Sequence, residues 1–78
     1  MATSAYVLIE AVPGKALELA KSIEGSEGVK GVHAVTGPYD VIALVEVANI
    51  KALGELIVKK IQATNKVSKT LTCICVEE

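Results

Sequence analysis

Four consecutive residues, Gly37, Pro38, Tyr39 and Asp40, are the best candidates in this sequence for binding a small molecule. Glycine and proline favour a tight turn, and such a turn can aim backbone N–H groups at a carboxylate. The Asp40 carboxylate can pair with an ammonium group, and Tyr39 can cover an aliphatic side chain. The alternative is a plain β-turn in which Asp40 accepts hydrogen bonds from local amides.

A second candidate group lies near the end of the chain. Thr70, Thr72 and Ile74 are spaced two apart, so in a strand their side chains point to the same face. The two hydroxyls can contact a small polar ligand. The alternative, which is the more common case, is that they are ordinary strand residues, because threonine is frequent in strands.

The remaining reactive residues offer little for catalysis or for a metal. His33 is the single histidine, and no nucleophile or carboxylate close in sequence pairs with it as a general base requires. Cys73 and Cys75 would lie roughly 6–7 Å apart along a strand, a poor distance for a disulfide. We therefore expect free thiols, no metal site and no cofactor. Glu10 and Glu46 would suit acid–base chemistry only if they faced each other.

The pattern of apolar residues and turns predicts the elements that hold these candidates. Short segments rich in β-branched residues predict strands over residues 5–11, 32–36, 41–48 and 71–76. Two helices are expected between them, the first ending at Gly25 and the second running from an Asn49 cap to Asn65. Their apolar stripes are Ala16, Leu17, Ala20 and Ile23 in the first helix, and Ile50, Leu53, Ile57 and Ile61 in the second.

This order of elements predicts an α+β, ferredoxin-like fold. A strand-helix-strand-strand-helix-strand chain with right-handed crossovers gives a four-stranded antiparallel sheet with two helices on one face. The short turn at residues 37–40 makes the second and third strands a hairpin.

Both faces of this predicted sheet are apolar. In the first strand Val7 and Ile9 line one face, while Tyr6 and Leu8 line the other. The third and fourth strands repeat the pattern, although a sheet with one wet face should alternate apolar and polar residues. Two helices cover only one face, so the other must be buried by something else. We expect a homo-oligomer whose unit is a two-fold dimer.

Composition limits the remaining classes of function. The chain has 78 residues, of which 51% are hydrophobic, and a net charge of −1. We expect one domain over residues 1–78 and no direct contact with nucleic acid, because no concentrated basic patch is present. No apolar run reaches the ~18 residues that a membrane span requires. The first residues lack the basic start of a signal peptide, so a cytoplasmic location is expected.

Three segments, residues 6–9, 32–41 and 72–78, resemble the effector-binding (RAM) domain of the Lrp/AsnC, or feast/famine, transcriptional regulators. The resemblance extends over essentially the whole chain. Its most specific part is Thr36-Gly37-Pro38-Tyr39-Asp40, a Thr-Gly-x-Tyr-Asp turn that follows a short strand.

The resemblance implies a function in amino-acid sensing. Members of this family bind amino acids or related effectors in clefts between subunits, often where dimers meet in rings of eight or ten chains. By this resemblance Gly37, Pro38, Tyr39 and Asp40 form the effector-binding turn, and Thr70, Thr72 and Ile74 complete the pocket. Effector binding would then shift the balance between assemblies.

The resemblance also raises an expectation about partners. Full-length regulators of the family carry an N-terminal helix-turn-helix domain that reads DNA. The first strand here starts within about five residues of Met1, too early for such a domain. A stand-alone effector domain that acts through a full-length regulator is expected.

Two other classes of function remain as alternatives. One is a small enzyme of the dimeric α+β barrel type, such as a monooxygenase or an isomerase, for which His33 would be the candidate catalytic residue. The other is a purely structural domain whose only role is assembly. The scarcity of catalytic side chains favours a protein that is not an enzyme.

Overall fold

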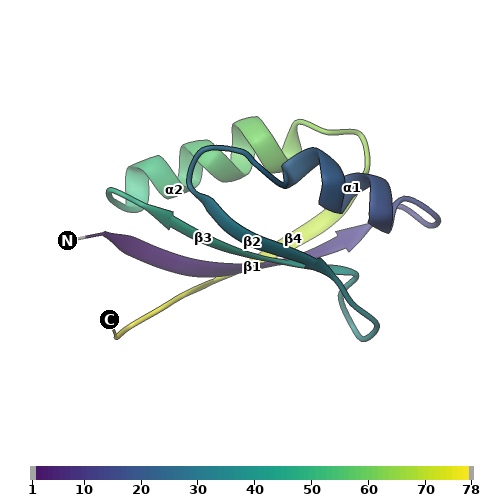
Figure 1. Ribbon diagram of the computed structural model, residues 1–78, viewed down its shortest axis with the longest axis horizontal. Helices are drawn as coiled ribbons and strands as arrows, with labels where there is room; N and C mark the ends of the chain where they lie inside the picture. The colour runs from purple at the N-terminus through teal and green to yellow at the C-terminus, as the bar shows by residue number, and fades with distance from the viewer. Residues whose placement is uncertain (1, 78) are drawn as a thin grey trace.

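The chain folds as a four-stranded sheet with helices packed on one face (Figure 1). The structure is a computed structural model that describes residues 2–77, so Met1 and Glu78 of the expected 1–78 domain lie outside it. Its elements in chain order are β1 (Thr3–Ala11), α1 (Ala16–Ile23), β2 (Val29–Ala34), β3 (Val41–Val47), α2 (Ile50–Leu56), the π-helix η1 (Ile57–Gln62) and β4 (Val67–Ile74). The predicted ferredoxin-like order is confirmed.

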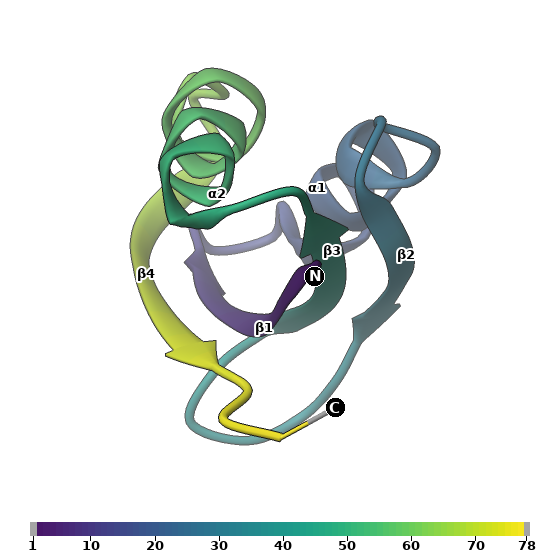
Figure 2. The same ribbon diagram turned by 90° about the vertical axis from the view of Figure 1, so that its left-hand side faces the viewer.

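The strands lie in the order β2-β3-β1-β4, and all three pairings are antiparallel. Viewed along the sheet, α1 and α2 lie on the same side of it (Figure 2). The expected hairpin of β2 and β3 is present. The turn between these strands lies at one end of the sheet, and the start of β1 and the end of β4 lie at the other (Figure 1).

The core lies between the sheet and the helices. Val7, Ile9, Val41 and Val45 point from the two central strands toward the helices and are fully buried. Leu19 and Ile23 of α1 and Leu53, Leu56 and Ile61 of α2 and η1 cover them. The expected division of β1 and β3 into two faces is therefore confirmed, since their odd-numbered residues form the core.

The predicted strand ends are wrong at both edge strands. β2 covers residues 29–34 rather than 32–36, and β4 covers 67–74 rather than 71–76. Glycines such as Gly28 and Gly31 are typical of loops, but Val29 and Gly31 pair with Val45 and Leu44 of β3, so β2 begins earlier than its sequence indicates. Ser68 and Lys69 are polar, so the sequence gives little sign that β4 begins before Leu71. In the structure this first part of β4 pairs with the end of β1 through a bulge.

The predicted helix stripes are partly wrong. Leu17 and Ile50 are 70% and 64% exposed, and Leu19 and Leu56 are buried instead. In α1 the buried stripe runs through Leu19 and Ile23, with Ala16 and Ala20 packed beside them, so Leu17 points away from the core. Near the end of the second helix, the widening to a π-helix from Ile57 sets which residues face the sheet.

The predicted helix signals at Asn49 and Gly25 are confirmed. The Asn49 side chain accepts a hydrogen bond from the Ala52 N–H at 2.8 Å, which is an N-cap of α2. Gly25 follows α1 with a φ of +85°, a left-handed conformation that suits glycine.

Candidate functional site

The 37–40 turn is tied to the end of β1 by Asp40. The Asp40 carboxylate accepts a hydrogen bond from the Ala11 N–H at 2.8 Å. Its backbone N–H donates to the Ile9 carbonyl at 2.9 Å, and its carbonyl accepts from the Val35 N–H at 2.8 Å. The Asp40 carboxylate therefore caps an amide 29 residues away in sequence, not a local amide within the turn.

The other residues of the turn differ in exposure. Gly37 has a φ of +155°, and both it and Pro38 are exposed, while Tyr39 is half-buried. The turn therefore presents backbone and ring surface to the outside, whereas one oxygen of Asp40 is used internally.

Thr70, Thr72 and Ile74 share the helix-facing side of edge strand β4, as their spacing predicted. They lie opposite Ile9, Val7 and Ala5 of β1 respectively. Thr70 and Thr72 are half-buried and Ile74 is 44% exposed. The Thr70 hydroxyl accepts a hydrogen bond from the Gln62 side-chain amide at 3.0 Å, which joins β4 to η1.

One chain does not bring these two groups together. The turn leads into β3, and β1 lies between β3 and β4, so β3 and β4 are roughly 10 Å apart. Ile74 is further removed, because it pairs with Ala5, four residues along β1 from Ile9. Within a single chain the predicted pocket is therefore incomplete.

The helix-free side of the sheet carries a contiguous apolar patch. Leu8 lies between Ile42 and Leu71, and the neighbouring Tyr6 lies between Leu44 and Cys73. We call these six residues the open-face patch. Tyr6 and Leu71 are 46% and 48% exposed, so this side of the sheet is uncovered in a single chain.

The other reactive residues lie on this same side or at its margin. His33 is exposed and pairs with Ile42, a position that gives the enzyme hypothesis no support. Glu10 lies opposite Lys69, and Glu46 forms an ion pair of 3.9 Å with Lys30, so the two glutamates do not face each other. Both cysteines are free thiols, Cys73 exposed and Cys75 half-buried.

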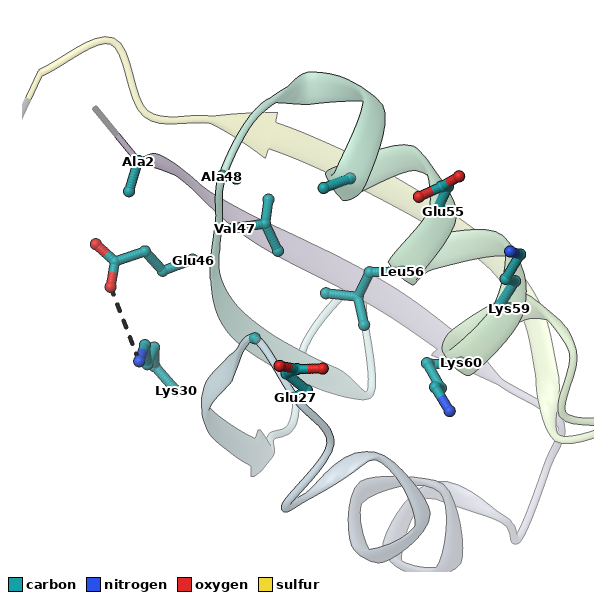
Figure 3. A pocket seen from close by; sticks show the side chains of 12 residues that line it. Ala2, Glu27, Lys30, Glu46, Val47, Ala48, Glu55, Leu56, Lys59 and Lys60 are labelled. Atoms are coloured by element: carbon teal, nitrogen blue, oxygen red, sulfur yellow. Dashed lines mark ion pairs between the residues drawn. The ribbon is translucent and has the colours of Figure 1, made fainter.

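Sequence reasoning missed a groove on the helix side of the molecule (Figure 3). It has a volume of about 760 Å³ and runs between the second helix and the loop that precedes β2. Glu27, Gly28, Leu56 and Lys60 are among its lining residues. These residues come from separate segments of the sequence, so no local motif predicts the groove.

The sequence matches one known family over nearly its whole length. The family model described as the Lrp/AsnC ligand binding domain matches residues 4–78. The chain belongs to this family.

Proteins similar to this Lrp/AsnC domain include transcriptional regulators and solved structures. An uncharacterized HTH-type transcriptional regulator of Pyrococcus furiosus is 32% identical over an alignment of 77 residues, and the match covers 95% of this chain and 51% of the regulator. The Lrp/AsnC domain thus spans about half the length of the curated relatives it matches. The crystal structure of TTHA0845 from Thermus thermophilus superimposes with a TM-score of 0.92 at 29% identity, and covers 97% of this chain and 95% of that one.

A second similar structure contains a ligand. It is a feast or famine regulatory protein of M. tuberculosis complexed with L-methionine, with 26% identity and a TM-score of 0.77. It matches over 97% of this chain and 51% of that protein.

The helices of the Lrp/AsnC domain are short. Across residues 2–77, none has the length and apolar character needed to pass through a lipid bilayer.

Proposed function

We propose that this domain senses an amino acid and works as an oligomer, with a two-fold dimer as its unit. The observation that carries the proposal is the uncovered open-face patch, since a contiguous apolar surface of this kind marks an interface. A second copy is its natural cover, because a two-fold contact buries the same surface on both partners.

Burial of the open-face patch by a second copy of the chain is energetically favourable. Full burial of an aliphatic side chain stabilises by about 1.5–3 kcal/mol, and the patch holds four such side chains, Leu8, Ile42, Leu44 and Leu71. Glu10 and Lys69 lie opposite each other beside it. This margin therefore carries both charge signs and can meet a copy of itself without like-charge repulsion.

The effector pocket is proposed to lie between subunits. Gly37, Pro38, Tyr39 and Asp40 of one chain would meet Thr70, Thr72 and Ile74 of a neighbour, because β1 separates the two groups within one chain. The ligand-binding description of the family and the L-methionine held by the mycobacterial relative support an amino acid as effector.

Assembly beyond the dimer completes the proposal. Dimers would join into rings of eight or ten chains, and the bound amino acid would bias that assembly. The relatives are HTH-type transcriptional regulators, so a full-length regulator of this type is the proposed partner through which the domain modulates transcription.

The oligomer is tested by sedimentation velocity at micromolar concentration. We expect wild-type protein to sediment as a dimer or larger, and Leu71→Glu to shift it toward monomer, because a buried unpaired charge is costly. Val58→Glu is the matched control, since Val58 is 59% exposed on the helix side. A wild-type protein that stays monomeric would refute the proposal.

Sensing is tested by thermal unfolding with each of the twenty amino acids. A specific ligand at a hundredfold excess over its Kd stabilises by about 2.7 kcal/mol. Thr72→Val should reduce this stabilisation, whereas Ser68→Ala, which removes another hydroxyl from the same strand, should not. The absence of any stabilisation across the panel would contradict the proposal.

A further inference from the structure

The groove of about 760 Å³ is a candidate site separate from the proposed pocket. None of its lining residues belongs to the 37–40 turn, and Thr70, Thr72 and Ile74 are not among them. Its volume falls in the range typical of sites for small molecules, about 300–1,000 Å³. Since α2, η1, β3 and the loop before β2 all come from one chain, the groove needs no second subunit.

Its floor is apolar and is kept open by a glycine. Leu56 is 7% exposed, and Val47 is half-buried beside it. Gly28 has a φ of +90°, and a Cβ there would come within 3.1 Å of Val47 Cγ1 and 3.6 Å of Leu56 Cδ2. The Gly28 carbonyl accepts a hydrogen bond from the Glu46 N–H at 2.8 Å, which holds the loop against β3.

Two side chains of opposite charge, Glu27 and Lys60, lie on facing sides of this apolar floor. Glu27 comes from the loop before β2 and Lys60 from η1, with the Leu56 side chain between them (Figure 3). Within residues 2–77 neither forms an ion pair, whereas Lys30 and Glu46 at the other end of the groove are paired at 3.9 Å. The groove therefore offers a carboxylate, an ammonium group and apolar surface between them.

We infer that this groove binds a free amino acid with an aliphatic or thioether side chain. Its α-ammonium group pairs with Glu27, its α-carboxylate pairs with Lys60, and its side chain packs on Leu56 and Val47. The choice of ligand class rests on the proposed function, but the residues are different. The inference adds a second amino-acid site that is complete within each chain.

The test is calorimetric titration with L-methionine and with L-methioninamide, in which the carboxylate is replaced by a neutral amide. Glu27→Gln and Lys60→Met should each weaken L-methionine binding at this site about tenfold, the effect of losing one charge-assisted hydrogen bond. Lys60→Met should also erase the preference for methionine over its amide at the groove, because there the carboxylate is bound by that side chain. Lys51→Met, an exposed lysine of α2 outside the groove, is the control and should leave binding unchanged.

The outcomes separate this inference from the proposed function. If Thr72→Val abolishes all methionine binding while Glu27→Gln and Lys60→Met leave it intact, the groove is not a site and the proposed function stands. If Lys51→Met weakens binding as much as Lys60→Met, the effect is one of net charge and the inference is overturned. If wild-type protein binds no amino acid at all, the proposed function fails as well.

Discussion

At the scale of single residues, Asp40 positions the 37–40 turn through its bond to the Ala11 N–H. Asp40→Ala leaves this part-buried amide without an acceptor, which should lower the free energy of unfolding by about 1–3 kcal/mol. Asp40→Asn keeps a side-chain oxygen and should lose less than half of that. Urea denaturation at one protein concentration measures both, and equal losses in the two variants would contradict the positioning role.

Gly28 offers a second prediction at this scale. Gly28→Ala should destabilise the domain through backbone strain of about 1–2 kcal/mol and through the new contact of its Cβ with Val47. Gly25→Ala is the matched control, because its φ of +85° imposes the same strain but nothing lies within 4 Å. The two unfolding midpoints, compared directly, isolate the contact. Gly28→Ala unfolding at the same or a higher urea concentration than Gly25→Ala would show that the groove wall is not closely packed.

At the scale of elements, α2 depends on its N-cap. Asn49→Ala removes the acceptor of the Ala52 N–H and should cost about 1 kcal/mol of unfolding free energy. Asn49→Asp keeps an acceptor and should be close to wild type. The same urea series checks this, and the loss should not depend on added amino acid, because Asn49 lines neither the groove nor the proposed pocket.

At the scale of the whole molecule, stability should depend on protein concentration. If the open-face patch is buried by a second copy, folding and association are linked, and dilution lowers the unfolding midpoint. Thermal unfolding over a hundredfold range of concentration measures this for wild type and for Leu71→Glu. We expect the midpoint to fall on dilution only in the wild type, and a midpoint independent of concentration in both proteins would argue against the dimer.

The order of the elements and the two apolar faces of the sheet were determined by the sequence alone. Successive side chains of a strand point to opposite faces of the sheet, so the sequence of residues 5–11 and 41–48 assigns each side chain to a face regardless of what packs on that face. The Asn49 cap is local as well, since the N–H that it binds lies three residues away. Strand ends and helix stripes were less certain, because neighbouring strands and the extent of the core decide them, as at Gly31 and Leu17.

Only the tertiary structure decided which candidates share a site. Pairing on both edges of β1 separates the 37–40 turn from Thr70 and Ile74, a distance that no spacing along the chain encodes. The same folding occupies the Asp40 carboxylate with an amide 29 residues away. It also brings Glu27 and Lys60 to facing sides of one groove. Contacts between residues far apart in sequence depend on packing, and packing is a property of the assembled sheet and helices.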